Sequence, residues 1–149
     1  MKYILSKSKS GLGNRILSLL TAILYGDLCG RRVLVDWDDG MYSEPGENAA
    51  RDFFKDHAFG FFDDKFSYSS VYPRIWEGNL DKGMHWMFHR HTPGHDRNPF
   101  SYRKYSCDVS KLDYDEDVLV FWSYMHKIPH LRRHLNEQMK MLSSDEILA

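Results

Sequence analysis

Two short apolar runs near the start of the chain are typical of buried strands. They span residues 2–6 and 32–37, and polar or glycine-containing segments bound both of them. A third run of the same character spans residues 117–125. Because a helical pattern separates the first two runs, they predict a βαβ unit with parallel strands. We therefore expect an α/β fold, with a Rossmann-like parallel sheet and flanking helices in one domain over residues 1–149.

The segment between the first two runs has the period of a helix. Its apolar residues recur at three- and four-residue spacing from Asn14 to Cys29. Gly30 follows at the position where a glycine commonly ends a helix. This apolar stripe predicts packing of the helix against the sheet, and it consists of Ile16, Leu17, Leu20, Ile23, Leu24 and Leu28.

The remainder of the chain has fewer periodic segments. Asn48 is placed to cap a short helix running to about Phe59. Residues 60–110 combine many aromatic side chains with turn residues, so we expect a long irregular region packed through its rings. After Pro129, residues 130–142 predict an amphipathic helix whose apolar stripe is Leu131, Leu135, Met139 and Leu142. Ser144 resembles the cap of a further helix, which favours a chain that continues beyond Ala149.

Composition and charge narrow the expected partners. The chain has 20 Lys and Arg residues against 21 Asp and Glu residues, so no overall field attracts nucleic acid or an anionic membrane. No segment approaches the ~20 consecutive apolar residues of a membrane span. Cys29 and Cys107 are far apart and form no CxxC pair, which favours a reducing, cytoplasmic location. Any anion site must therefore be local.

The turn between the first strand and the helix carries the sequence GLGNR, residues 11–15. In a turn between a strand and a helix, Gly11 and Gly13 can take positive φ and let a ligand approach the backbone without a Cβ in the way. The N-terminus of a helix offers unpaired N–H groups and a positive dipole end, to which Arg15 adds a guanidinium. The loop is neither a Walker A motif nor a complete dinucleotide fingerprint. The alternative is a tight turn in which Arg15 is solvated or pairs with an acidic neighbour.

Residues 11–37 resemble the N-terminal segment of the bacterial nodulation fucosyltransferases (NodZ type), and more distantly the wider fucosyltransferase superfamily. The elements that carry the resemblance are Gly11, Gly13, Asn14, Arg15, Gly30, Arg31 and Trp37. It extends over residues 1 to about 45. It implies a GT-B-like enzyme with two Rossmann-like domains, which transfers fucose from GDP-fucose to a glycan acceptor without a metal cofactor.

By this resemblance the chain corresponds to the N-terminal half of such an enzyme. The donor-binding signature of the C-terminal domain is absent, so the chain alone is expected to be inactive and its catalytic residues are not assigned. Asn14 would bond a phosphate or a sugar hydroxyl, and Arg15 would neutralise the departing GDP. The residues implied to lie near the donor phosphates are Gly11, Leu12, Gly13, Asn14 and Arg15. The alternative is a non-enzymatic carbohydrate- or nucleotide-binding module that lacks the donor domain.

Further candidates lie on the sugar or acceptor side. A carboxylate at the carboxyl end of a parallel strand accepts hydroxyls or acts as a base, and indole rings stack on sugars. These candidates are Asp36, Trp37, Trp76 and Trp86. The histidine-rich residues 85–95 have spacings that would suit Zn²⁺, but Pro93 and Gly94 break a helix there. We expect no native metal site.

Overall fold

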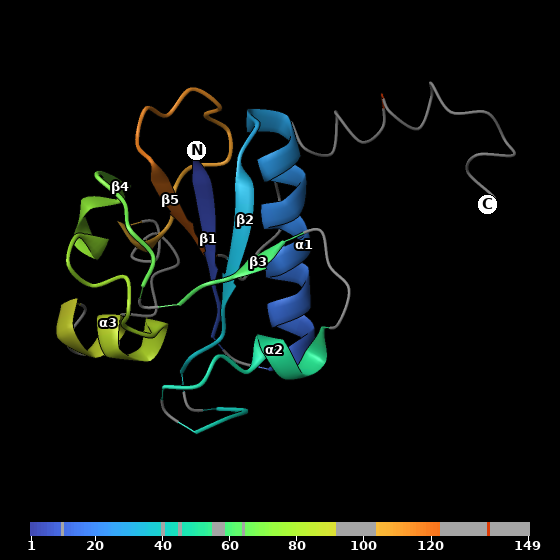
Figure 1. Ribbon diagram of the computed structural model, residues 1–149, viewed down its shortest axis with the longest axis vertical. Helices are drawn as coiled ribbons and strands as arrows, with labels where there is room; N and C mark the ends of the chain where they lie inside the picture. Colours follow the sequence, from blue (N-terminus) through green and yellow to red (C-terminus); the bar gives the residue numbers. More distant parts are fainter. Residues whose placement is uncertain are drawn as a thin grey trace, which may run out of the picture.

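The computed structural model describes residues 1–9, 11–39, 41–44, 46–54, 59–63, 65–91, 104–122 and 137. Within these residues the molecule is a twisted parallel sheet with α1 on one side and α3 on the other (Figure 1). The strands are β1 (Tyr3–Lys7), β2 (Arg32–Asp36), β3 (Gly60–Phe61), β4 (Val71–Tyr72) and β5 (Val118–Phe121).

The sheet has the order β3-β2-β1-β5-β4, and every neighbouring pair is parallel. In the register of the central strands, Leu5 of β1 lies opposite Leu34 of β2 and Val120 of β5. This arrangement confirms the predicted Rossmann-like α/β fold and the parallel pairing of its first two strands. The third predicted strand is confirmed as β5, and positions beyond 122 in that run lie outside the described residues.

Helix α1 (Leu12–Cys29) begins two residues before the predicted start and ends at the predicted residue. Gly30 has φ 68° and ψ 33°, which is the left-handed conformation, and its N–H donates to the Gly26 carbonyl. Glycine reaches this conformation without the clash that a Cβ would cause. The predicted glycine stop is confirmed.

Part of the predicted apolar stripe of α1 packs on the core, because Ile23, Leu24 and Leu28 are half-buried against it, but the rest of the stripe faces outward. Ile16, Leu17 and Leu20 are 38%, 48% and 52% exposed. The buried residues are mostly small or polar, and they are Arg15, Ser18, Leu19, Thr21, Ala22, Tyr25 and Gly26. At Gly26 an added Cβ would lie 2.8 Å from the Arg31 carbonyl oxygen, so the helix approaches the start of β2 closely. This close approach favours small residues on the inner face.

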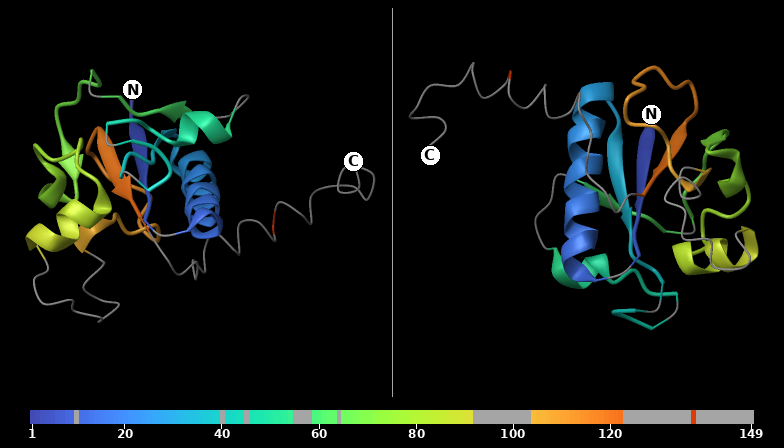
Figure 2. Two further views of the ribbon diagram at one scale, coloured as in Figure 1. Left: turned by 90° about the horizontal axis from the view of Figure 1, so that it is seen from below. Right: turned by 180° about the vertical axis from the view of Figure 1, so that it is seen from behind.

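Two hydrophobic cores form on the two faces of the sheet because side chains alternate along each strand. The core under α1 takes from the strands Ile4, Val33, Val35, Leu119 and Phe121. The opposite core takes Leu5, Leu34, Val71, Val118 and Val120. It is covered by the 3₁₀ helix η1 (Arg74–Trp76) and by α3 (Met84–His91). Figure 2 shows α1 and α3 on opposite sides of the sheet.

The region expected to be irregular contains regular elements, so that prediction is corrected. β3 and β4 are two residues long and give no periodic signal, yet each extends the sheet by one strand. α3 forms because Pro93 and Gly94, which argue against a helix in the sequence, lie beyond its last residue. Ring packing does hold this region, as in the contacts of Tyr3 with Phe66 and of Phe88 with Tyr105.

The short helix after Asn48 is present as α2 (Ala50–Phe53). It ends before the predicted boundary, and residues 55–58 lie outside the described part of the chain. The predicted helix at residues 130–142 also lies outside it, apart from Glu137.

Candidate functional site

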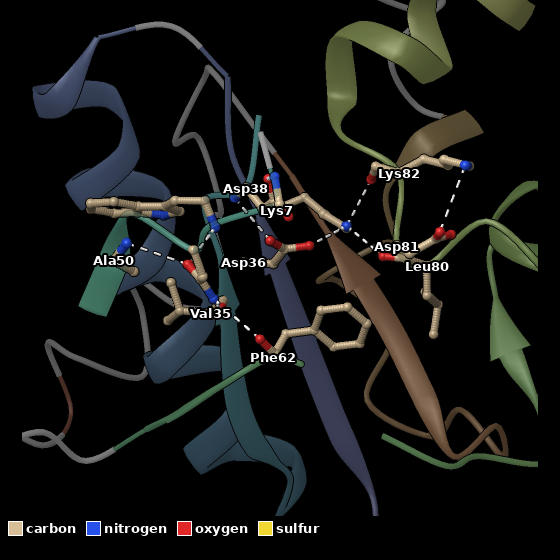
Figure 3. Close-up of polar contacts among 12 residues, drawn as sticks. Lys7, Val35, Asp36, Asp38, Ala50, Phe62, Leu80, Asp81 and Lys82 are labelled. Atoms are coloured by element: carbon tan, nitrogen blue, oxygen red, sulfur yellow. Dashed lines mark hydrogen bonds and ion pairs between the residues drawn. The ribbon is translucent and has the colours of Figure 1, made fainter. Parts of the chain in front are cut away.

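The carboxyl ends of β1 and β2 carry a buried ion pair between Lys7 and Asp36 (Figure 3). Their exposures are 1% and 4%. The Lys7 ammonium donates to Asp36 Oδ2, to the Leu80 carbonyl at 2.6 Å and to the Lys82 carbonyl at 2.8 Å, which uses all three of its protons. Asp36 Oδ1 accepts the Asp38 N–H at 2.9 Å. Asp36, a candidate sugar-binding residue, is therefore committed to holding β1, β2 and the 80–82 loop together.

Arg15 is fully buried and is not an exposed anion-binding fork. Its Nη2 donates to Asp39 Oδ2 and lies 3.3 Å from the Met41 sulfur. Its guanidinium carbon lies 5.0 Å from the centre of the Tyr42 ring and 5.9 Å from that of Trp37. These contacts fit the alternative interpretation of the sequence, in which Arg15 pairs with an acidic neighbour. In this arrangement it ties the loop after β2 to the first turn of α1.

Gly11 and Gly13 do not use the positive φ that is open to glycine, because neither is in the left-handed conformation. Gly11 has φ −71° and ψ 164° and is the N-cap of α1. Among the described residues the glycines with positive φ are Gly30, Gly46 and Gly78. A Cβ added at Gly11 or Gly13 would meet nothing within 4 Å. Neither backbone conformation nor internal packing requires a glycine here.

The N-terminus of α1 is therefore open and uncapped. Among the residues that the structure describes, no side chain caps it, and its first turn has no acidic residue. Gly11, Gly13 and Asn14 are exposed, whereas Leu12 is half-buried. The first N–H groups of a helix have no partner within the helix, and the helix dipole makes this end positive. The loop residues implied to lie near a donor thus form a surface that suits an anion, with Asn14 beside it.

Lys9 and His85 lie next to this helix end, where Lys9 adds positive charge and His85 adds a neutral imidazole. Burial lowers the pKa of Lys9, whose ammonium lies 4.5 Å from the centre of the Phe88 ring. Partial burial also lowers the pKa of His85, and the neighbouring Lys9 charge lowers it further, while Asp39 raises it. The contact of Lys9 with Phe88 places α3 beside the loop that follows β1. The sequence gives no signal for the pairing, because the two residues are far apart along the chain.

Two of the three candidate tryptophans are core residues. Trp37 and Trp76 have no exposed surface, and the Trp76 Nε1–H donates to the Tyr105 carbonyl at 2.8 Å. Neither ring offers a face to a sugar, which corrects the expectation for both. Trp86 on α3 is 42% exposed, and the Lys82 ammonium lies 5.2 Å from its ring centre. Sugar stacking is therefore open to Trp86 alone among these three.

A cavity of about 450 Å³ lies at the carboxyl ends of β2 and β3, beside the Lys7–Asp36 pair. Its lining is Asp36, Asp38, Gly46, Asn48, Arg51, Phe62, Asp63 and Asp81. Burial raises the pKa of Asp38, whose Oδ1 accepts the Gly46 N–H at 2.9 Å. A second cavity, of about 500 Å³, lies where β4 and β5 begin, among residues that include Arg74 and Glu77. Ligands of α/β sheets bind at the carboxyl ends of strands, which favours the first cavity.

Asn48 has a larger structural role than its sequence position indicates. Its side-chain amide donates to the Val35 carbonyl at 2.7 Å and to the Phe62 carbonyl at 3.3 Å. Its Oδ1 accepts the N–H groups of Trp37 at 3.0 Å and Ala50 at 3.3 Å. One side chain thus joins β2, the end of β3 and the start of α2. These bonds fix the position of the Asn48 side chain in the cavity wall.

Three of the four histidines from the histidine-rich segment lie on α3, at positions 85, 89 and 91, and His95 lies outside the described residues. Within the part of the chain that the structure describes, no three His, Cys, Asp or Glu side chains gather in a geometry that suits a metal ion. The absence of a native metal site stays a prediction.

The fold and these sites define an α/β protein with a Rossmann-like, all-parallel sheet. No family model, curated protein or solved structure matches the chain. Across the described ranges, every helix is too short or too polar to cross a membrane.

Proposed function

We propose that this chain is the N-terminal, Rossmann-like portion of a glycosyltransferase that moves fucose from GDP-fucose to a glycan acceptor. The proposal combines the resemblance of residues 11–37 to the NodZ-type enzymes with the position of that segment in the fold. The observation that carries it is the open N-terminus of α1 at the carboxyl edge of the sheet. There two glycines that the fold does not require leave the backbone accessible to a diphosphate.

The proposed roles of the residues at the carboxyl edge of the sheet differ from those that the sequence pattern indicates. Asn14 and the backbone N–H groups of the first turn would contact a phosphate or a sugar hydroxyl. Arg15 would have an indirect role from its buried position, because its pairing with Asp39 fixes the loop after β2 against the helix. Lys9 would add positive charge beside the same helix end, and the neutral imidazole of His85 would add a hydrogen-bonding group. No catalytic residue is assigned to the transfer step.

One surface of this kind supports only weak binding. A charged hydrogen bond contributes roughly 1.5–3 kcal/mol, whereas a millimolar dissociation constant needs about 4 kcal/mol. We therefore expect GDP to bind with a dissociation constant in the millimolar range or weaker. We also expect no fucose transfer from GDP-fucose by the 149-residue chain, because a second domain is needed to hold donor and acceptor in line.

A titration of ¹⁵N-labelled protein with GDP and, separately, with free fucose tests the proposal against its rival. We expect GDP to shift the amide signals of residues 11–15 at millimolar concentration. The rival is a non-enzymatic carbohydrate- or nucleotide-binding module, and its carbohydrate-binding form predicts instead that fucose shifts the signals of the cavity residues Asp38 and Arg51 and that GDP leaves residues 11–15 unchanged. Fucose transfer by the chain alone would contradict the proposed division between two domains.

A further inference from the structure

The outer face of α3 combines an exposed aromatic ring with basic side chains. The helix is fixed by its inner face, where Met84 and Met87 have no exposed surface and the Phe88 ring lies 4.8 Å from that of Tyr105. The residues on the outer face are exposed, and they are His85, Trp86, His89 and Arg90. Because the apolar side of α3 is already packed on the core, the Trp86 indole is available to a ligand.

Two cations lie beside Trp86 on this face. Lys82 comes four residues before it and Arg90 four residues after it, which is the spacing at which neighbours on a helix meet. The Lys82 ammonium lies 5.2 Å from the centre of the Trp86 ring, and the Arg90 guanidinium carbon lies 6.0 Å from it. Lys82 has an exposed pair with Asp81 at 3.6 Å (Figure 3). Within the described ranges Arg90 has no ion pair, so both cations can bind an added anion.

Positive charge gathers around α3 although the chain as a whole is nearly neutral, with 20 basic residues against 21 acidic ones. The Lys9 ammonium lies 4.5 Å from the centre of the Phe88 ring, and the Lys104 ammonium donates to the His91 carbonyl at 2.6 Å. The helix itself has no acidic residue. A local positive surface on a neutral chain suits a small anion better than a long polyanion, which the acidic residues elsewhere would repel.

We propose that the outer face of α3 binds a saccharide that carries a carboxylate, with the sugar ring on Trp86 and the carboxylate beside Lys82 and Arg90. An indole offers a flat apolar surface to the C–H groups of a sugar. A guanidinium binds both oxygens of a carboxylate in a planar fork, and an ammonium adds a second charge. A neutral sugar would leave both cations unused, which is why the surface favours an acidic one.

This surface is continuous with the carboxyl edge of the sheet. The Lys82 carbonyl accepts from the Lys7 ammonium, and Asp81 lines the cavity at the ends of β2 and β3. A Cβ added at Gly83 would lie 3.3 Å from the Asp38 carbonyl oxygen, so the start of α3 lies against the loop after β2. The saccharide would therefore lie beside the cavity. Its role as the glycan acceptor rests on the proposed function, whereas its binding to α3 does not.

An NMR titration with methyl glucuronide and, as its neutral match, methyl glucoside tests the binding. We expect the glucuronide to shift the amide signals of residues 85–90. It should bind roughly three- to tenfold more tightly than the glucoside, because each exposed ion pair contributes little. Added salt should weaken the binding of the glucuronide only. The GDP response of residues 11–15 is recorded separately, so the two sites fail or succeed independently.

Lys82→Met and Lys111→Met form a matched pair of variants, because each lysine lies beside an aromatic ring. The Lys111 ammonium lies 4.6 Å from the centre of the Tyr114 ring, away from α3. We expect Lys82→Met to reduce the preference for the glucuronide and Lys111→Met to retain it. Trp86→Ala should abolish the response to both sugars, and the signals of the sheet residues report whether each variant is folded.

Four results would overturn the proposal. The first is equal affinity for the glucuronide and the glucoside, and the second is an equal effect of Lys82→Met and Lys111→Met. The third is a stronger response to a sulfated glucose, which would assign the face to sulfated sugars. The fourth is a stronger response to a thymidine oligonucleotide, which would assign it to single-stranded nucleic acid.

Discussion

The Lys7–Asp36 pair is the residue-scale feature on which the carboxyl edge of the sheet depends. Both side chains are removed from water, and Lys7 also holds the carbonyls of Leu80 and Lys82. Burial of two charges is unfavourable by itself, and the pair offsets it only through complete hydrogen bonding. Loss of one partner leaves an uncompensated buried charge. The pair therefore positions the 80–82 loop and the wall of the neighbouring cavity together.

We predict that Asp36→Asn lowers the free energy of unfolding by roughly 3–5 kcal/mol, the range for breaking a buried pair from one side. Asp81→Asn is the matched control, because Asp81 forms a pair with Lys82 at 3.6 Å in which the side chains are 58% and 39% exposed. Its loss should change the free energy by about 0–1 kcal/mol. Urea denaturation measures both. Similar small losses in the two variants would show that the Lys7–Asp36 pair is not an anchor.

His85 provides a test of the charges beside the helix end. Burial and the Lys9 charge lower the pKa of His85, so its NMR titration midpoint should lie below the ordinary value of 6.5. Lys9→Met should move the midpoint upward, because one of the causes is removed. The folded state binds this proton less readily than the unfolded state, so its contribution to stability is lost as the pH falls through the lowered pKa. If Lys9→Met leaves the titration midpoint of His85 unchanged, the Lys9 charge does not influence His85.

At the scale of elements, α1 serves two surfaces with different demands. Its inner face lies so close to β2 that Gly26 has no room for a Cβ, whereas the space above Gly13 is open. The same substitution at these two positions should therefore have opposite effects.

We predict that Gly26→Ala destabilises the protein by roughly 1–3 kcal/mol, because the Arg31 carbonyl is backbone and cannot move aside cheaply. Gly13→Ala should stabilise it by roughly 0.5–1 kcal/mol, since alanine is the better helix former and meets no neighbour. Thermal or urea denaturation of the two variants makes the comparison. Destabilisation by Gly13→Ala would indicate that Gly13 has a structural role.

The sequence predicts the elements with strong periodic or terminal signals, and it misses what depends on tertiary packing. β1, α1, β2 and β5 follow from apolar runs and from Gly30. The side of α1 that packs on the sheet does not follow from the sequence, because Arg15 and Ser18 occupy inner positions that a hydrophobic pattern assigns to solvent. β3 and β4 are too short for any period. Trp37 has the indole ring that stacking on a sugar requires, but it is buried as a core residue. Sequence alone does not distinguish the two roles.

The sequence indicates where the candidate site lies, but it does not identify all of the residues that form it. A glycine-containing turn between a strand and a helix points to the N-terminus of α1, and the structure places that end open at the carboxyl edge of the sheet. The partners of Lys7 and Arg15 come from loops that are distant in sequence, so no local pattern reveals them. Lys9 and His85 were missed for the same reason.

At the scale of the whole molecule, the proposed function assigns the described residues to one side of a site between two domains. The open end of α1 and the cavity beside Asp38 share the carboxyl edge of one sheet, where ligands of α/β proteins bind. The proposed donor therefore needs only one accessible edge on this chain. The central claim of the proposed function is that the first turn of α1 binds a diphosphate.

The most direct test of that claim compares GDP binding by Gly13→Leu and Asp27→Leu, with amide shifts measured by NMR. Leucine is a strong helix former, so both variants should keep α1, but Gly13→Leu places a side chain over the open first turn. Asp27→Leu adds the same side chain near the other end of the helix. We predict that Gly13→Leu abolishes the millimolar GDP response at residues 11–15 and that Asp27→Leu retains it. Equal GDP responses in the two variants would contradict the account.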